Sequence, residues 1–346
     1  MYLLFKNYNT NYIKLFGTKM RTEKVERLLL SGKMTAFDMA NVKKAQIYKI
    51  IEKYRWADNG GKPYCPRCGN CEKIYRIKTR RQYRCKECNY TFSPFVDTTF
   101  SNHSFRGENG LVRAFYMVSL FAQNISARKV ALYSGVSRKT AWFFLQKVRN
   151  TLDNYNYDIK LKNIIEIDGV YFYKDKFNPE RTRVAIFARE RSSDPKIKGA
   201  ILTKVFVALS ENSNDILKFA LKHFVLKSEI QTDEHVAYKI LKKPLFKHRA
   251  VKHSEEYVSK DGVNNNQCES LNARAREIIQ RQSRGVRKNY FLNYLFEVAY
   301  RGDTCHWSKG EVFFDLLKRC LRSAVPSDLV GYYQGNRRIG ERIGVE

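Results

Sequence analysis

Three acidic side chains are candidates to act together as ligands of metal ions. Asp168 lies in the apolar run IIEIDGVYF, Asp233 ends EIQTD, and Glu269 opens ESLNARARE. Three carboxylates brought together repel one another, by about 4 kcal/mol for a pair at about 4 Å with an effective dielectric near 20, so the group needs cations. Mg²⁺ and Mn²⁺ prefer such oxygen ligands, and two ions about 3.5 to 4 Å apart activate a water or a 3′-hydroxyl and stabilise the leaving oxygen. The three acids therefore predict a two-metal site for phosphoryl transfer.

Each acid also has a structural interpretation. Asp168 can be a buried acid of an apolar strand, Asp233 can cap a helix, and Glu269 can be a surface acid paired with Arg276. These interpretations need no metal, and the residue types alone do not exclude them.

Two further side chains are candidates for a supporting role. Glu166 shares a strand face with Asp168 by the period of two, and we expect it to support the metal ligands rather than to bind metal. His253 in AVKHSEEYV is interpreted either as a contact to a metal-ligating side chain or to DNA, or as a satisfied interior histidine.

Cysteine spacing predicts a zinc site. Two Cys-x-x-Cys pairs can close a tetrahedral thiolate site around structural zinc, and they consist of Cys65, Cys68, Cys85 and Cys88. Gly69 and Asn89, which follow the pairs, tolerate the left-handed backbone that such turns require. Cys71 lies outside both pairs and is expected to be a spectator. The alternative is that these are four core cysteines without metal. Cysteines that bind metal rather than form disulfides indicate a reducing compartment.

Basic side chains in several segments are candidates for DNA contacts. The stretch SARKVALYSGVSRKTAWFFLQKVR has the pattern of a helix-turn-helix, with Gly135 in the turn, Ser137 as the next helix cap, and Arg138 and Lys139 at the start of the second helix. An ordinary helical hairpin is the alternative for this stretch, and a merely solvated basic face is the alternative for the basic residues between the cysteine pairs. The remaining candidates are Arg80, Arg81 and Arg84 between the cysteine pairs, and Arg274 and Arg276 after Glu269.

The composition supports a polyanion as partner. Lysine and arginine number 64 against 34 acids, which gives a formal net charge of +30, and the 43% hydrophobic content is enough to fill cores in two or three domains. No apolar run approaches the roughly 20 residues of a membrane helix, and the opening segment does not have the pattern of a signal peptide. Nucleic acid is therefore the leading partner, and a membrane is not expected.

The elements that must position the acids follow from the hydrophobic pattern. Three runs rich in β-branched and aromatic residues begin at Asn163; a helix capped by Asn212 or Ser213 and a fourth strand, SEIQTD, follow. A ribonuclease-H-like fold begins with this β-β-β-α-β order. Its first and fourth strands lie side by side, which would bring Asp168 and Asp233 together, while Glu269 would arrive on a later helix.

These motifs together resemble the Merlin-type, ISXO-like insertion-sequence transposases, a group with an acidic (DDE) triad. The likeness runs from Tyr54 to Arg301 through YRWADNGGKPYCPRCG, SGVSRKTAWFFLQKVR, IEIDGVYF, TDEHVAY, NNNQCESLNARAR and GVRKNYFLNYLFEVAYR. The resemblance implies a zinc ribbon, a helical DNA-binding region and a ribonuclease-H-like core. It also implies that the triad matches Asp168, Asp233 and Glu269. The chain departs from the family by carrying Gly169 where an acid usually follows the first Asp, and Arg274 and Arg276 where a lysine-arginine pair is usual.

The sequence therefore predicts a multidomain DNA transposase. It would bind terminal inverted repeats as a homo-oligomer, hydrolyse the DNA ends and join the 3′-hydroxyls to target DNA, in the cytoplasm of a prokaryote or in a nucleus. A DNA-binding regulator with an inactive core and a structure-specific nuclease of the same fold are the alternatives. The predicted parts are a basic helical segment (1–57), the zinc ribbon (58–100), the helix-turn-helix-like region (107–155), the catalytic core (160–302) and a helical C-terminal extension (303–346).

Overall fold

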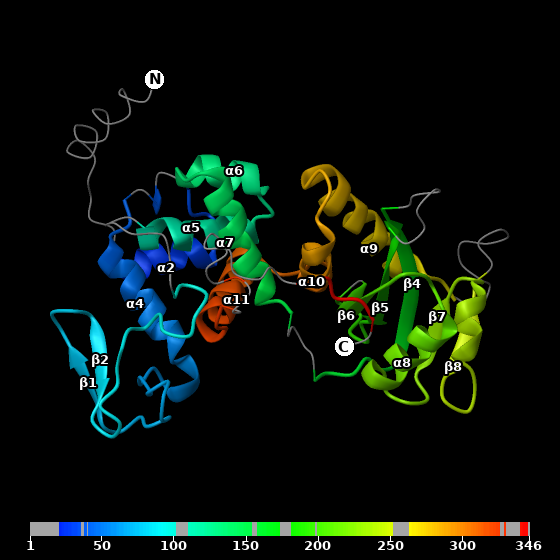
Figure 1. Ribbon diagram of the computed structural model, residues 1–346, viewed down its shortest axis with the longest axis horizontal. Coiled ribbons are helices and arrows are strands. Elements are labelled where there is room, and N and C mark those ends of the chain that lie inside the picture. The colour runs from blue at the N-terminus through cyan, green and yellow to red at the C-terminus, as the bar shows by residue number, and fades with distance from the viewer. Residues whose placement is uncertain are drawn as a thin grey trace. The chain divides into compact units, whose positions relative to one another are not determined.

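The computed structural model describes residues 21–35, 38–39, 41–101, 110–153, 158–173, 181–197, 199–251, 263–325, 329 and 340–344. It divides into two compact units (Figure 1). Unit 1 comprises residues 1–148 and 307–326, and unit 2 comprises residues 149–306 and 327–346. The helices of the described residues include none that is long and apolar enough to cross a membrane.

Unit 1 combines a small antiparallel sheet with helices. The sheet has the order β1-β2-β3, and its strands are β1 (Ile74–Ile77), β2 (Gln82–Cys85) and β3 (Thr91–Phe92). The helices are α2 (Thr22–Leu30), α4 (Lys44–Arg55), the short η1 (Ala57–Asn59), α5 (Gly110–Ala122), α6 (Ala127–Ser134), α7 (Arg138–Asn150, which ends in unit 2) and α11 (Lys309–Arg322). The chain returns to unit 1 in α11, which packs against α2, α4 and α5.

Apolar residues at helical spacing form the core of unit 1. On α4, Ile47, Ile50 and Ile51 are at most 1% exposed. On α7, the stripe that includes Phe144 and Leu145 is equally buried. Both helices therefore present the faces that the spacing of their apolar residues predicts.

Unit 2 is built on a mixed five-stranded sheet of order β6-β5-β4-β7-β8. Its strands are β4 (Ile164–Phe172), β5 (Arg183–Arg191), β6 (Ala200–Ala208), β7 (Glu229–Thr232) and β8 (Lys247–Ala250). Its helices are α8 (Ser213–His223), η3 (Val236–Ile240), α9 (Asn266–Arg276), the π-helical η4 (Glu277–Gln282) and α10 (Lys288–Asp303). The β-β-β-α-β order is confirmed, and so is the adjacency of the first and fourth strands. Asn212 caps α8 by accepting a hydrogen bond from the backbone N–H of Asp215.

The two faces of this sheet are covered differently because side chains alternate along β4. Ile165 and Ile167 point to a core that contains Phe219 of α8 and Tyr238 of η3. The intervening residues of β4 point to the face on which α9 and α10 lie, and Phe172 there makes an edge contact with an aromatic ring of α10. Glu166 and Asp168 therefore meet α9, the helix that carries Glu269. Figure 1 shows α9 beside β4.

Candidate active site and zinc ribbon

Asp168 lies in the second half of β4 and is half-buried. Its Oδ1 accepts the backbone N–H of Gly169 at 2.9 Å, and its Oδ2 accepts Nδ2 of Asn272 at 2.7 Å. Asn272 lies on α9, one turn after Glu269, so the helix holds the Asp168 carboxylate directly. Sequence reasoning did not single out Asn272, because its role depends on how α9 packs on β4.

Asp233 follows the last residue of β7 and is brought to Asp168 by strand register. β4 and β7 run parallel, with Ile164 opposite Glu229 and Glu166 opposite Gln231. The same offset, continued for two residues, sets Asp168 beside Asp233. The Asp233 carboxylate is held in place by the backbone N–H of His235, which donates to Oδ1 at 3.0 Å.

Glu269 lies in the first turn of α9, and Glu166 anchors that turn. Glu166 is fully buried, and its Oε2 accepts the backbone N–H groups of Gln267 at 2.7 Å and Cys268 at 3.2 Å. Its Oε1 pairs with Nε of Arg191 at 2.6 Å. A carboxylate at a helix N-terminus satisfies free N–H groups and the helix dipole, so Glu166 fixes the start of the helix that carries Glu269.

The acids interact electrostatically. Burial raises the pKa of Asp168 to about 7, and the negative charge of Asp233 adds to the rise, with smaller contributions from Glu211 and Glu269. In the described residues these carboxylates do not all converge within 4.8 Å of one another, and only the four cysteines form a group that tight. A cation bound here would offset the burial and the negative charges that raise the pKa of Asp168.

A fourth acid, Glu211, lies beside this group. A Cβ added to Gly169 would stand 1.7 Å from Oε1 of Glu211, so that carboxylate occupies the space left by the missing side chain. Its Oε2 lies 3.2 Å from Nδ1 of His235, the residue whose N–H holds Asp233. Glu211 stands in the turn between β6 and α8, and no motif in the sequence marks it.

The chemistry of the donor set fits a hard divalent cation. Besides the carboxylates, the buried oxygens that lack a hydrogen-bond partner in the described residues include Oδ1 of Asn272, whose amide nitrogen is bound to Asp168, and the hydroxyl of Tyr238. The charges of Glu211, Asp168 and Asp233 all raise the pKa of Tyr238, after its burial, so its hydroxyl lies near these acids. Carboxylate and amide oxygens are ligands suited to Mg²⁺ or Mn²⁺.

The four predicted cysteines come together in unit 1. Their sulfur atoms all lie within 4.8 Å of one another, with Cys65 and Cys88 at 3.5 Å and Cys68 and Cys85 at 3.6 Å. Sulfurs that ligate one zinc at about 2.3 Å are about 3.8 Å apart, so the cluster has the size of a tetrahedral zinc site. Cys71 is exposed and outside the cluster.

The turns of the cysteine pairs have the expected backbone. Gly69 and Asn89 have φ of 74° and 57°. Burial opposes ionisation of the Cys65 thiol, but hydrogen bonds from the backbone N–H groups of Cys68 and Arg67 outweigh it and lower its pKa to about 7. The first turn therefore favours a thiolate at Cys65, the form that binds zinc.

The candidate DNA-contacting residues are exposed. Gly135 ends α6 with φ of 63°, and Ser137 caps α7 through the N–H of Thr140, which places Arg138 and Lys139 in the exposed first turn. In the ribbon Arg81 stacks on Tyr48, with 4.7 Å to the ring centroid. The other exposed candidates are Arg80, Arg84, Arg274 and Arg276. The predicted contact at His253 lies outside the described residues.

Comparison with known families adds two matches. Residues 160–303 match the model of the ISXO2-like transposase domain, and residues 43–91 match that of the transposase zinc-ribbon domain. No curated protein matches the chain. The first match spans the sheet and all four acids, and the second spans the cysteine cluster.

Proposed function

Because the chain belongs to the family of ISXO2-like transposases, we propose that it is a DNA transposase that binds inverted repeats, hydrolyses the DNA ends and joins the freed 3′-hydroxyls to target DNA. The observation that carries the proposal is the register of β4 and β7, which sets Asp168 beside Asp233 below the helix of Glu269. We further propose that the mixed sheet is a ribonuclease-H-like core, on the order and adjacency of its strands.

Asp168, Asp233 and Glu269 are the residues that would hold the catalytic Mg²⁺ or Mn²⁺. Bound cations would supply Lewis-acid activation of the attacking oxygen and charge for the leaving oxygen. Asn272 fixes one oxygen of Asp168, and Glu166 fixes the helix start beneath Glu269. Glu211 has a positioning role, because it holds His235 and thereby the turn that presents Asp233.

DNA recognition is assigned mainly to unit 1. Arg138 and Lys139 stand at the exposed start of α7, where a recognition helix contacts base edges and phosphates in the major groove. Arg80, Arg81 and Arg84 of the ribbon would contact the DNA backbone, with structural zinc holding the ribbon together. In unit 2, Arg274 and Arg276 lie on α9 beyond Glu269 and would contact phosphates near the reacting bond. Transposition joins two ends, so the active form is a homo-oligomer.

The test is strand transfer by full-length protein on a pre-cleaved end with Mg²⁺ or Mn²⁺. Glu269→Gln keeps the shape of the side chain but removes the charge that offsets the cation, so joining falls by orders of magnitude while DNA binding survives. The matched control is Glu277→Gln, in the next turns of the same helical run, where the carboxylate pairs with Arg281 at 3.0 Å. Such a surface pair is worth at most about 1 kcal/mol, so the control joins ends within several-fold of the parent.

The same variants have a readout without DNA. Mn²⁺ raises the melting temperature of the parent and the Glu277→Gln protein, and raises that of Glu269→Gln less. Near-normal joining by Glu269→Gln removes this residue from the triad. Cutting without joining by the parent indicates a nuclease instead, and neither activity indicates a DNA-binding regulator.

A further inference from the structure

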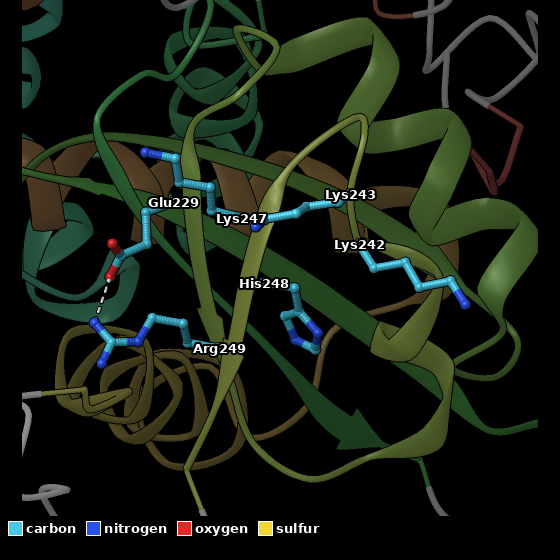
Figure 2. A pocket seen from close by; sticks show the side chains of 6 residues that line it. All are labelled: Glu229, Lys242, Lys243, Lys247, His248 and Arg249. Atoms are coloured by element: carbon cyan, nitrogen blue, oxygen red, sulfur yellow. Dashed lines mark ion pairs between the residues drawn. The ribbon is translucent and has the colours of Figure 1, made fainter.

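A basic pocket of about 490 Å³ opens at the edge of the sheet in unit 2. Its lining is Glu229, Lys242, Lys243, Lys247, His248 and Arg249. Figure 2 shows Lys247, Arg249 and Glu229 on one side of the β8 ribbon, and His248 and Lys242 on the other. Among the described residues β8 is the last strand of the sheet order, so the pocket lies along an edge strand.

The charge of this pocket is strongly positive. Its one acid, Glu229, is engaged by Arg249, with 3.6 Å between Oε1 and Nη1, and by Nε2 of Gln231 at 2.7 Å. Lys242, Lys243 and Lys247 are exposed, and in the part of the chain that the structure describes no carboxylate lies within 4.0 Å of their ammonium groups. These three cations therefore face solvent with no counter-ion among the described residues.

The pocket and the acids of the candidate active site lie along the same strand direction of the sheet. β7 and β8 run parallel, with Glu229 opposite Lys247 and Thr232 opposite Ala250, and Asp233 follows Thr232. At about 3.3 Å per residue, Lys247 lies about 13 Å before Asp233 along the strand direction. That length corresponds to about four base steps of duplex DNA at about 3.4 Å each.

A direct link also joins the pocket to that site. The Thr232 hydroxyl donates to the carbonyl of Asp233 at 2.7 Å, so it accepts from Nε2 of His248, 2.8 Å away. His248 thus connects the pocket wall to the backbone that presents Asp233, and it is held as part of the wall rather than left to bind a ligand.

We propose that this pocket binds backbone phosphates of the DNA whose reacting phosphate lies at Asp168 and Asp233, about four base steps away. The inference rests on the proposed function and adds a further DNA contact to it, separate from the recognition of the ends. Lysines act as point charges that position a backbone without reading bases, so the contact is independent of sequence.

The lining favours nucleic acid over a protein partner. Every lining side chain is charged or an imidazole. The cores of protein interfaces are depleted in charge and rich in aromatic and apolar side chains, which this pocket lacks. Lys247 and Arg249 lie two residues apart on one side of β8, about 7 Å from each other, so they reach different phosphates of one strand.

The test compares two triple variants of the full-length protein. The pocket variant is Lys242→Gln/Lys243→Gln/Lys247→Gln, which keeps side-chain length and removes three charges. The control removes three exposed lysines of the same unit outside the pocket and is Lys162→Gln/Lys196→Gln/Lys218→Gln. Fluorescence anisotropy measures binding to a pre-cleaved end duplex over a range of salt concentrations.

We expect the slope of log K against log salt to become shallower by about 2 to 3 in the pocket variant, because each phosphate contact contributes about 0.9. The control slope changes by less than about 1. Ethylation interference locates the contact: the parent and the control are sensitive to ethylation of phosphates about four base steps from the reacting bond, and the pocket variant is not.

The pocket and the proposed function fail in different ways. If the pocket variant has the parent's salt slope and the parent's ethylation pattern, the pocket does not bind DNA phosphates. That conclusion holds even if the parent joins ends and Glu269→Gln does not. A parent that never joins ends overturns the function, while the salt slope still tests the pocket. If the pocket variant loses binding to a polyglutamate peptide but binds DNA as the parent does, nucleic acid is not the occupant of the pocket.

Discussion

Gly169→Ala tests the packing of Glu211 against the strand that carries Asp168. The added Cβ would stand 1.7 Å from Oε1 and 2.6 Å from Cδ of Glu211, whereas real contacts of a Cβ essentially never fall below 3.0 Å. The carboxylate must therefore move by more than about 1 Å. Its side chain is only 6% exposed, and the movement breaks the 3.2 Å contact with His235.

Two magnitudes follow from this displacement. Overpacking of a buried site costs about 1 to 3 kcal/mol, and each kcal/mol lowers the melting temperature by about 2 to 4 °C for a unit of this size. His235 holds Asp233, and a misplacement of about 1 Å in a catalytic group costs about 100-fold in rate. We expect a melting temperature lower by several degrees and strand transfer slower by about 10- to 100-fold.

The double variant Gly169→Ala/Glu211→Ala separates crowding from function. It removes the clash, so the melting temperature recovers toward that of the parent. Strand transfer on a pre-cleaved end stays low if the Glu211 carboxylate positions the Asp233 turn. A Gly169→Ala protein with the parent's stability and rate refutes the contact, and a double variant that recovers both refutes the role of Glu211.

Three other predictions concern zinc, recognition and pH. Metal analysis should show that Cys65→Ser has lost its zinc, and this variant should also lose specific end binding, whereas Cys71→Ser keeps both. Equal zinc loss from the two variants would contradict the four-ligand site. Arg138→Ala/Lys139→Ala should abolish footprints on the repeat ends but keep salt-sensitive non-specific binding, and unchanged footprints would exclude α7 as the reader. The pKa of Asp168 is raised to about 7, so the folded protein binds a proton that the unfolded chain has released, and the metal-free protein loses stability as pH rises from about 4 to 7. Because Mn²⁺ must displace that proton, its affinity measured by calorimetry rises about tenfold per pH unit up to about pH 7 and then becomes constant. Asp168→Asn should flatten both pH profiles, and a flat profile in the parent would show that Asp168 is already ionised.

The sequence by itself determined the features that depend on local spacing. Two Cys-x-x-Cys pairs predict the cysteine cluster, because each turn brings its own two sulfurs together. The turn at Gly135 and the cap at Ser137 follow from the backbone preferences of single residues. The period of two and the chain order gave strands in the right succession, and adjacency of the first and fourth strands brought Asp168 and Asp233 together. The predicted catalytic roles of these acids stay predictions.

Only the tertiary structure decided which distant side chains surround those acids. Asn272, Glu211 and the basic pocket on β8 belong to segments far from Asp168 in the chain, and nothing in their own periodicity marks them. Glu166 shares a face with Asp168, as the period of two predicts, but its binding to the first turn of α9 depends on how that helix packs on the sheet. Local patterns specify elements and turns, whereas contacts between elements are set by strand register and helix packing, which are properties of the whole chain.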